Sequence, residues 1–561
     1  MGDAEAAAEA EAPEAQLQDV PADCAVFILL ALKPRERARC ACVCRAWRAL
    51  VAQPAAWAEL DLRGAAVCGA TLRMLAARSA GTLQRLELTA SAALPPEDVL
   101  AVALAARGAL HSLQIDAASE SENDDEDDTA SSDSDEEADD GAFGVEDAAA
   151  LHFVPTARVP LRAAVLDALL RSLLATGRAL SLCLDRASLL PADAAALATD
   201  ALAGGARLQT LSLRYNSVGA DGASSLARLA PRCSSLRLGF NDVGDAGAAC
   251  LAACMSDEGC VLTALELRHC GVGPAGTAAL ANAMRYGAPL QRLCLAYCPL
   301  GAAGARALGS ALATGQCALT SLDAGHCALG RAGVAALARG GSGLSRLRAL
   351  SLPHNSICPL GAVEVARLLR SAPALTSLHL GFNALGDYGL RDVCVALRGG
   401  PRLRRLAVPV CNAGPAGARR LAGLLRACPA LEVMDAGGNA MGAAVATLAA
   451  GMQDGGGALR TLRLRSSGAD DAAAHAIARA MRPGAGGAGL EQLDLRGCPL
   501  GDDAAAALAA AAMLPGSRIA LIDLRDTFVG AADAGAAQLR AAVRAREGRL
   551  RLRGVPEPTH T

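Results

Sequence analysis

The chain has 561 residues, of which 52% are hydrophobic and only 2% aromatic, and its formal net charge is −4 at pH 7. No apolar run approaches the roughly 20 residues of a membrane span, and residues 1–14 lack the basic start and apolar core of an export signal. We therefore expect the 20 cysteines to be reduced thiols in the cytoplasm or nucleus. Few aromatic residues also mean that the core is built mainly from small aliphatic side chains.

Both tryptophans of the chain lie in one compact pattern near the N-terminus. Asp19-Val20-Pro21 precedes an apolar Ile28-Leu29 with Leu32, which is followed by Val43-Cys44-Arg45-Ala46-Trp47-Arg48 and then by Trp57. Pro21 suits the first position of a helix, Lys33-Pro34 interrupts that helix, and residues 35–51 form a second helix with Val43, Trp47 and Leu50 on one face. Two short helices with so small a core are expected to bind a partner.

This pattern resembles an F-box, with Val20 where the family usually has leucine. The resemblance implies binding to a Skp-type adaptor and, through it, to a cullin-RING ubiquitin ligase. The residues that it assigns to adaptor binding are Val20, Pro21, Ile28, Leu29, Leu32, Val43, Cys44, Trp47 and Trp57. The alternative is a helical pair that only caps the rest of the chain, with both tryptophans in its core.

A frame of the form L-x-x-L-x-L-x-x-(N/C)-x-L recurs along the remainder of the chain. It opens at Ala179, Leu208, Cys233, Leu262, Leu290, Leu319, Leu347, Leu375, Leu403, Leu431, Leu459, Leu490 and Ile519, and weaker copies open at Trp57, Leu83 and Leu110. From Ala179 onward the openings lie 25 to 31 residues apart. This is the leucine-rich repeat, and its period, with the Gly-x-x-Gly and Ala-Leu helix that follow, resembles the ribonuclease-inhibitor class.

Each repeat has a simple physical interpretation. Alternate leucines such as Leu211 and Leu213 point to one side of a short strand, and Asn216 can satisfy backbone groups in the turn that follows. Gly219 and Gly222 suit the loop that enters a helix. We predict an α/β fold: a leucine-rich-repeat solenoid, or horseshoe, with a parallel concave sheet, convex helices and a small N-terminal α-helical F-box.

An acidic segment interrupts the early repeats. Residues 119–140 contain 13 acidic residues and no basic one, so we expect 116–157 to be an unstructured insertion. Either it is a tolerated solvated loop, or it is a switch that phosphorylation makes more negative. The candidate phosphorylation sites have Asp or Glu three residues later and are Ser119, Ser121, Ser132 and Ser134.

Two side-chain patterns mark a candidate substrate-binding surface on the repeats. The residue before the Asn/Cys position is an aromatic residue or histidine in seven successive repeats: Tyr215, Phe240, His269, Tyr297, His326, His354 and Phe382. At about 5 Å per repeat these rings would form a continuous band, which either packs the loops or binds a partner. The second pattern places Arg465, Arg496 and Arg525 two residues before that position, where neighbouring Asp residues neutralise them or an anion binds.

The predicted organisation follows the chain from end to end. It comprises an acidic N-terminus (1–16), an F-box (17–60), first repeats (61–115), the acidic insertion (116–157), the main repeat array (158–547) and a basic C-terminal tail (548–561). No catalytic residues, metal site or cofactor are expected, because no Ser-His-Asp order, metal triad or nucleotide loop is present. Neither nucleic acid nor a membrane is expected as a partner.

We predict a non-catalytic substrate-recognition subunit of an SCF-type cullin-RING ubiquitin ligase. Its F-box would bind the Skp-type adaptor, and the concave face of its repeats would bind a protein substrate. One alternative is a repeat scaffold or inhibitor of the ribonuclease-inhibitor type. Another is a GTPase-activating repeat protein, in which the acidic tract would be expected after the repeats rather than inside them.

Overall fold

The computed structural model describes four early strands and most of the chain from residue 179 to residue 555. The gaps within that stretch are 187–188, 204–206, 258, 399–401, 456, 531–533 and 547–548. The predicted N-terminus (1–16), the F-box residues before the first strand and the four candidate phosphorylation sites lie outside the described residues. Contacts divide the chain into two units, which are considered one at a time.

The first unit contains short parallel strands that follow one another in chain order. They are β1 (Glu59–Leu62), β2 (Arg85–Ala90), β3 (Ser112–Ala117), β4 (Leu151–Phe153), β5 (Ala179–Leu184) and β6 (Arg207–Ser212). Helix α8 (Pro191–Ala203) lies between the last two in the chain, and the first unit includes it from Ala196 onward. Leucines pair with leucines from strand to strand, as in Leu60 with Leu86 and Leu86 with Leu113. The weak early copies of the repeat therefore form strands as expected.

Strand β4 differs from the expectation for the acidic insertion. It lies within the range 116–157 that we expected to be unstructured, and it pairs in parallel with β3, where Phe153 faces Ile115. Its sequence, Leu-His-Phe, alternates apolar and polar residues as a half-buried strand does. The leucine frame missed β4 because the segment contributes only three residues to the sheet. Residues 118–150 lie outside the described residues.

The second unit repeats a strand, a turn and a helix, and its strands β7 to β18 are parallel neighbours in chain order. Its strands are β7 (Cys233–Arg237), β8 (Ala264–Glu266), β9 (Arg292–Cys294), β10 (Ser321–Asp323), β11 (Ala349–Ser351), β12 (Ser377–His379), β13 (Arg405–Ala407), β14 (Val433–Asp435), β15 (Thr461–Arg463), β16 (Gln492–Asp494), β17 (Leu521–Asp523) and β18 (Arg551–Arg553). The α-helices are α9 (Gly219–Ala227), α10 (Gly244–Met255), α11 (Pro274–Arg285), α12 (Gly301–Ala313), α13 (Gly330–Ala338), α14 (Pro359–Arg370), α15 (Gly386–Leu397), α16 (Pro415–Ala427), α17 (Val445–Gly455), α18 (Asp471–Ala480), α19 (Asp502–Ala512) and α20 (Ala534–Ala545). Short 3-10 helices are η4 (Gly341–Arg346), η5 (Gly442–Ala444) and η6 (Gly486–Gly489).

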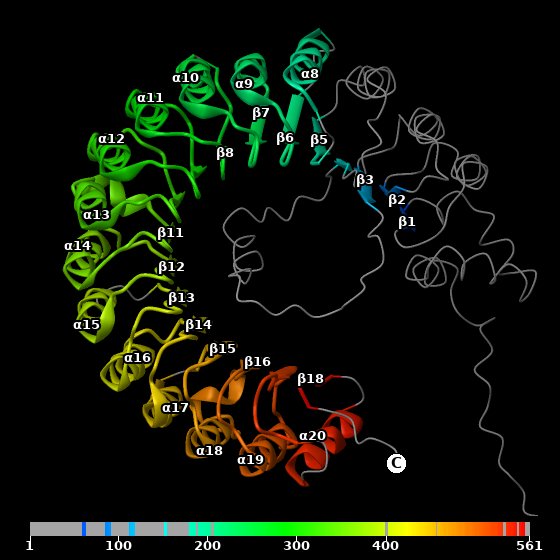
Figure 1. Cartoon of the computed structure of the whole chain (residues 1–561), viewed down its shortest axis with the longest axis vertical. Helices are drawn as coiled ribbons and strands as arrows, with labels where there is room; N and C mark the ends of the chain where they lie inside the picture. The colour runs from blue at the N-terminus through cyan, green and yellow to red at the C-terminus, as the bar shows by residue number, and fades with distance from the viewer. Residues whose placement is uncertain are drawn as a thin grey trace, which may run out of the picture. The chain divides into compact units, whose positions relative to one another are not determined.

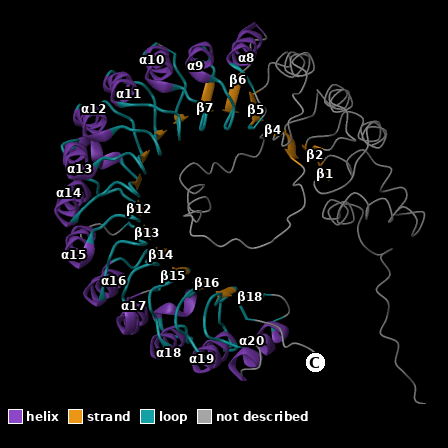
Figure 2. Cartoon of the chain, in the orientation of Figure 1, coloured by secondary structure: helices purple, strands orange, loops and turns teal. Residues whose placement is uncertain are grey.

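These elements form two layers within the second unit. Its strands line the inner side of an arc and its helices the outer side (Figure 1), with loops joining the two in every repeat (Figure 2). The leucine-rich-repeat solenoid predicted from the sequence is confirmed. Strand β18 falls within 548–561, the segment expected to be a basic tail, because Leu552 continues the column of paired apolar residues beside Ile522.

The core lies between the two layers and consists of aliphatic side chains, as the composition indicated. Leu378 and Leu380 from a strand and its turn are 1% and 0% exposed, and Leu390 and Val393 of the helix that follows are both 0% exposed. Helix α14 shows how the outer layer forms: Pro359 occupies its first turn, and its buried face includes Val365 and other apolar residues. Burying each leucine contributes roughly 1.5–3 kcal/mol.

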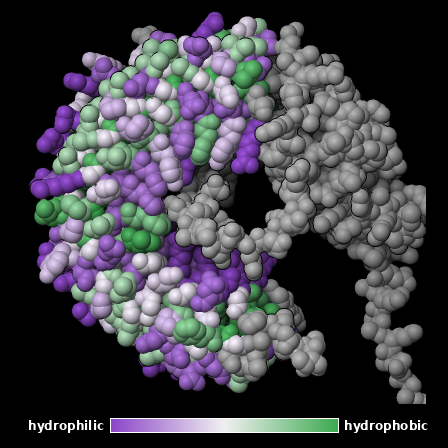
Figure 3. All heavy atoms as spheres, in the orientation of Figure 1, coloured by the Kyte–Doolittle hydropathy of each residue, from purple (hydrophilic) through white to green (hydrophobic). Residues whose placement is uncertain are grey.

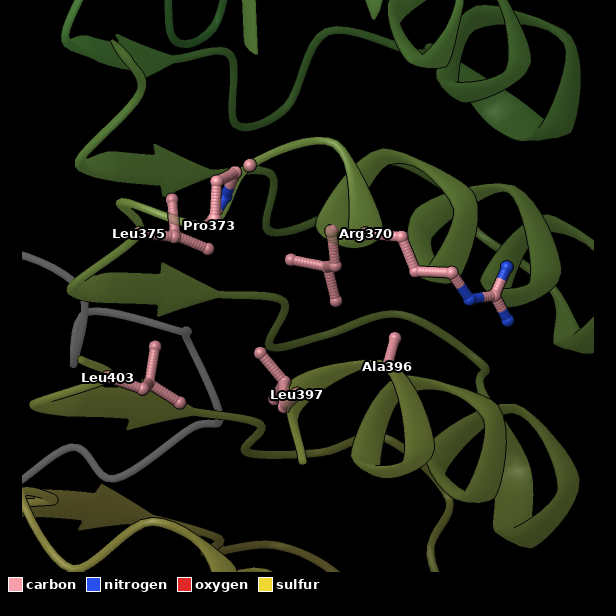
Figure 4. Close-up of a pocket in the computed structure, with 8 residues that line it drawn as sticks. Arg370, Pro373, Leu375, Ala396, Leu397 and Leu403 are labelled. Atoms are coloured by element: carbon pink, nitrogen blue, oxygen red, sulfur yellow. The ribbon is translucent and has the colours of Figure 1, made fainter. Parts of the chain in front are cut away.

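One small cavity of about 160 Å³ lies between two successive repeats of the second unit. Leu375, Leu397 and Leu403 turn toward one another around it, whereas the guanidinium of Arg370 points away (Figure 4). The cavity is lined by the same leucines that form the inter-repeat core. It is therefore a packing gap between neighbouring repeats rather than a ligand site.

Candidate functional site: the ring column and the arginine rungs

The residue before the Asn/Cys position adopts a left-handed backbone conformation in every repeat from Tyr215 to Phe382. These residues are not glycine, yet their φ angles lie between 52° and 61°, a region that bulky side chains rarely occupy. Each of their backbone N–H groups donates to the carbonyl two residues before the Asn/Cys position of the next repeat, as from Tyr297 to Gly325 at 2.8 Å and from Phe382 to Pro409 at 2.8 Å. Inter-strand pairing thus extends into the turn and spaces the side chains one repeat apart.

The seven side chains stack on one another, and we call them the ring column: Tyr215, Phe240, His269, Tyr297, His326, His354 and Phe382. Five of the six successive contacts are parallel stacks, with ring centroids 4.2, 5.0, 3.9, 3.8 and 4.1 Å apart and interplanar angles of 10° to 20°. The continuous band predicted from the sequence is therefore present. Because stacked neighbours cover the ring faces, the exposed parts of the column are mainly ring edges, and the Nε2 atoms of His326 and His354 are buried.

The fold does not demand rings at this position. The same turn position in later repeats is held, also at positive φ, by Val410, Gly438, Ser466, Gly497 and Asp526. Small or polar residues therefore satisfy the backbone equally well. Stacking within the column supports the interpretation of the rings as packing residues, and it leaves their outward edges to contact a partner.

The column opens at one step, between His269 and Tyr297. Their ring centroids are 6.1 Å apart and tilted by 34°. The guanidinium of Arg268 lies over the Tyr297 ring, 4.8 Å from its centroid. Tyr297 also packs against a buried cluster of Ala264, Cys294 and Ala296, which holds its ring in place. At this opening, the positively charged guanidinium of Arg268 therefore makes a cation–π contact with Tyr297.

The Asn/Cys position next to the column has the structural role expected from the sequence. The side-chain oxygen of Asn383 accepts from the backbone of Asn355 and of Ile357, both at 3.0 Å, and its amide nitrogen donates to the carbonyl of Leu352 at 2.9 Å. A cysteine at this position makes some of the same hydrogen bonds, since the thiol of Cys270 donates to the Leu238 carbonyl at 3.0 Å. Burial raises the pKa of the Cys270 thiol to about 12.

The arginines two residues before this position lie on the later repeats and are paired with Asp residues. Arg496 donates through Nη2 to Asp494 at 3.0 Å, and Arg525 donates through Nη2 to Asp523 at 2.8 Å. Hydrogen bonding to these carboxylates raises the pKa of both guanidinium groups. Arg496 also lies 3.6 Å from the Asp523 carboxylate. The expected neutralisation by neighbouring Asp residues is present at these two rungs, where a rung is the strand and turn of one repeat.

Arg465 belongs to the same pattern but has different surroundings. Its Cγ lies close above Gly437 of the preceding rung, only 2.6 Å from where a Cβ of that residue would be. Beside it, burial raises the pKa of Asp435, while hydrogen bonding from Gly437 and the charges of Arg463 and Arg465 act in the opposite direction. The three arginines therefore do not form a uniform anion-binding row.

Two further arginines share this position and were not singled out from the sequence. Arg214 and Arg268 stand two residues before Asn216 and Cys270, as Arg465, Arg496 and Arg525 do in later repeats. Aligning every repeat at its Asn/Cys position would have revealed them. Arg214 donates through Nε to Glu266 at 3.0 Å and so reaches across the rung of Gly239.

The described residues also show how polar the surface is and which kinds of site they do not form. Hydrophilic side chains lie along both the inner and the outer margins of the second unit (Figure 3). Among the described residues, no His, Cys, Asp or Glu group is arranged to hold a metal ion, and the cysteines are free thiols. No helix in the described part of the chain is long and apolar enough to cross a membrane.

The expected adaptor-binding residues lie outside the described residues, and comparison with protein families addresses that segment. Residues 17–63 match the F-box-like family model. Residues 208–227, 234–252, 256–281, 372–394 and 490–509 match the Leucine Rich repeat model. The chain thus carries an F-box-like domain followed by leucine-rich repeats, as the sequence patterns predicted.

The chain was also compared with curated proteins and with solved structures, and two of the similar structures are described here. No curated protein matches the chain. An internalin (inlF) from Listeria monocytogenes is similar with a TM-score of 0.37 and 14% identity, over 60% of this chain and 83% of that one. A structure of the Rad7 and Elc1 complex in yeast is similar with a TM-score of 0.42 and 15% identity, over 70% of this chain and 88% of that one.

Proposed function

We propose that this chain, which joins an F-box-like domain to leucine-rich repeats, is the substrate-recognition subunit of an SCF-type cullin-RING ubiquitin ligase. The single observation that carries the proposal is the match of residues 17–63 to the F-box-like model, ahead of a repeat array that offers a large binding surface. In this proposal the F-box-like segment binds a Skp-type adaptor, and the inner face of the repeats binds a protein substrate. The chain itself contributes binding and no chemistry.

The inner face has the properties that a protein-binding surface needs. Short strands place polar and charged side chains on the face opposite the leucine core, while the ring column adds a rigid edge beside them. Large rigid side chains lose little conformational entropy on binding, and charged groups select among partners. We propose that the ring column and the three rungs of Arg465, Arg496 and Arg525 contact the substrate.

The experiment is affinity purification of the full chain, and of a variant lacking residues 1–60, followed by identification of the bound proteins. The proposal expects the adaptor and the cullin to co-purify only with the full chain. It expects substrates that bind the repeats to co-purify with both. Recovery of neither adaptor nor cullin by the full chain would contradict the proposal and favour a scaffold or inhibitor in which the N-terminal segment only caps the repeats.

A further inference from the structure

The outer side of the second unit carries exposed apolar side chains on the neighbouring helices α14 and α15 (Figure 1). In the described part of the chain, every large hydrophobic side chain that is exposed within a helix belongs to these two helices. We call these residues the outer apolar patch: Leu360 and Val363 of α14, 60% and 41% exposed, and Tyr388 and Val395 of α15, 75% and 49% exposed. Exposed hydrophobic residues gathered on one face commonly mark an interaction surface.

The two helices approach closely enough to make the outer apolar patch one surface. Leu360 and Tyr388 occupy the same position in successive repeats, five residues after the Asn of the turn. Beside Tyr388, a Cβ at Gly389 would lie only 2.8 Å from the Cβ of Ala362, so glycine permits the first turns of the helices to meet. Val395 stands about two turns, or roughly 10 Å, further along α15 than Tyr388. The patch thus extends across two helices and along about two turns.

Arginines border the outer apolar patch. Helices α14, α15 and α16, with the C-terminal cap of α15, carry seven arginines and three acidic residues, and all seven arginines are exposed. Three of the arginines hold the same position in successive repeats, at the C-terminal ends of these helices, and they are Arg370, Arg398 and Arg426. The others are Arg367, Arg391, Arg419 and Arg420. Positive charge therefore surrounds the exposed apolar side chains.

The acidic residues of these helices do not neutralise this charge. Glu364 is 8% exposed and lies 3.0 Å from Arg367. Asp392 lies 2.9 Å from Arg391, and Asp387 accepts the backbone hydrogen bonds at the start of α16. Among the residues that the structure describes, four arginines of this group form no ion pair, and they are Arg370, Arg398, Arg419 and Arg420. The outer face of α14 to α16 thus keeps a net positive charge.

Arg398 and Arg420 lie near one another where α15 packs on α16. A Cβ at Gly423 would lie 2.9 Å from Nη2 of Arg398, so the guanidinium of Arg398 lies over α16 at a position where glycine leaves room. Burial raises the pKa of the Cys394 thiol to about 12, and the charges of Arg398 and Arg420 act in the opposite direction, so both arginines lie near this thiol. Two like charges held close together repel one another, and a bound carboxylate would offset that repulsion.

The outer apolar patch fits an acidic protein helix better than a lipid surface. Faces that enter a membrane insert large side chains such as Trp, Phe and Leu, whereas two of the four patch residues are the short Val363 and Val395. An amphipathic helix places apolar residues at i, i+3 or i+4, and i+7, which span about 10 Å. That length matches the extent of the patch along α15. Acidic residues on the flanks of such a helix would face the bordering arginines.

We infer that the outer face of α14 and α15 binds an acidic amphipathic helix of a partner protein. The apolar side of that helix covers the outer apolar patch, and its carboxylates pair with Arg370, Arg398 and Arg420. Charge-assisted hydrogen bonds to carboxylates give the arginines their selectivity for an acidic partner. This surface is separate from the inner face that the proposed function assigns to the substrate, so the inference goes beyond that function.

The test is fluorescence anisotropy with the full chain and a fluorescein-labelled peptide of about four helical turns. The peptide is held helical by a hydrocarbon staple, with Leu at i, i+3 and i+7 and Glu on both flanks. Two matched peptides carry Gln in place of Glu, or Ser in place of Leu. The inference expects the acidic peptide to bind and its affinity to fall as salt is added. Both matched peptides should bind at least about tenfold more weakly.

Variants of exposed residues locate the binding surface. Tyr388→Ser should weaken binding of the acidic peptide about tenfold or more, because aromatic anchors contribute strongly to interfaces. The matched control is Tyr286→Ser, which changes a tyrosine that is 76% exposed at the end of α11 and should leave the affinity unchanged. Arg398→Gln should weaken binding and reduce its salt dependence, whereas Arg306→Gln on α12 should do neither. Circular dichroism of each variant confirms that the repeats are folded.

Several results would overturn the inference. Equal affinity of the wild type and Tyr388→Ser would place the peptide elsewhere, and equal binding of the acidic peptide and its Gln counterpart would remove the role of the arginines. Co-sedimentation with phosphatidylserine vesicles that is lost in Tyr388→Ser, without peptide binding, would assign the surface to a membrane. The peptide is also tested on a variant in which a short flexible linker replaces residues 118–150, which removes competition by the chain's own acidic tract. Failure of both proteins to bind the acidic peptide contradicts the inference.

Discussion

At the scale of single residues, the ring column combines a strained backbone with favourable side-chain contacts. Each of its members occupies the left-handed region, which costs a non-glycine residue roughly 1–2 kcal/mol. Each ring pair contributes about 0.5–1.5 kcal/mol beyond the surface it buries. The strain and the stacking therefore have similar magnitudes, and glycine holds the same turn position at Gly438 and Gly497.

His354 allows these two contributions to be separated. It stacks on His326 at 3.8 Å and on Phe382 at 4.1 Å, with a φ of 52°. His354→Ala should lower the free energy of unfolding by about 1–3 kcal/mol, because both stacks are lost and the strain remains. His354→Gly should be less destabilising than His354→Ala because glycine adopts positive φ without strain. Urea denaturation measures both, and an alanine variant as stable as the wild type would show that stacking contributes nothing.

The buried cysteines give a second prediction at this scale. Burial raises the pKa of the thiols of Cys270, Cys394 and Cys411 to about 12. Only the thiolate reacts with alkylating agents, and it forms appreciably only as the pH rises toward that value. We expect these three thiols to resist iodoacetamide at pH 8 in the native protein and to react once it is unfolded. Mass spectrometry of the digested protein measures this, and rapid native labelling of Cys394 would contradict the structure.

At the scale of elements, neighbouring helices are joined by acidic side chains that cap the next helix in the array. Asp387, in the first turn of α15, accepts hydrogen bonds from the backbone N–H groups of Gly414 and Gly417 at the start of α16, both at 2.7 Å. Asp245 makes the equivalent bonds to Gly273 and Gly276. Added Cβ atoms would lie 3.2 Å and 2.9 Å from the Asp387 carboxylate at Gly414 and Gly417, which accounts for glycine there.

Removing such a cap should destabilise the array. Asp387→Ala leaves two backbone donors at the start of α16 without their acceptor, and we expect a loss of about 1–2 kcal/mol in the free energy of unfolding. The control is Asp392→Ala in the same helix, which removes only a pair with the partly exposed Arg391 and should change stability little. Urea denaturation compares the two. Equal effects would mean that the capping bonds contribute no more than a surface ion pair.

The limits of sequence-based prediction are clearest for these elements. Alternate leucines and the Asn/Cys position are sufficient to predict the strands, the turns and the order of the repeats, because those features depend on local periodicity. The caps from Asp387 and the pair between Arg214 and Glu266 connect different repeats, and their geometry follows only once the repeats are stacked. Strand β18 escaped prediction because its Arg-Leu-Arg sequence has only one apolar residue and reads as a charged tail.

At the scale of the whole molecule, the repeats supply a surface and the N-terminal segment supplies the proposed connection to a ligase. The acidic tract between β3 and β4 lies outside the described residues, and its 13 acidic residues over 119–140 lack the apolar content of a packed segment. We expect that replacing residues 118–150 by a short flexible linker leaves the thermal midpoint nearly unchanged. Differential scanning calorimetry measures this, and a large fall in the midpoint would show that the tract packs on the repeats.

Some features of the candidate site could be predicted from the local sequence pattern, whereas others depend on how the repeats stack. The ring column could be predicted because one ring recurs in the same turn position seven times. Its opening at His269 and Tyr297, and the placement of Arg268 over that tyrosine, depend on ring orientations that no spacing reveals. The neutralisation of Arg496 and Arg525 could be anticipated because Asp494 and Asp523 stand two residues before them.

The central claim is that residues 17–63 bind a Skp-type adaptor. Trp47 belongs to the pattern that resembles an F-box, and truncating a tryptophan at the centre of an interface removes about 2 kcal/mol or more of binding free energy. Isothermal titration calorimetry of a purified Skp-type adaptor against the wild type and Trp47→Ala tests this directly. We expect the wild type to bind and Trp47→Ala to lose at least about 30-fold in affinity while the circular dichroism of the repeats is unchanged. Equal affinity of both proteins, or no binding by either, would contradict the account.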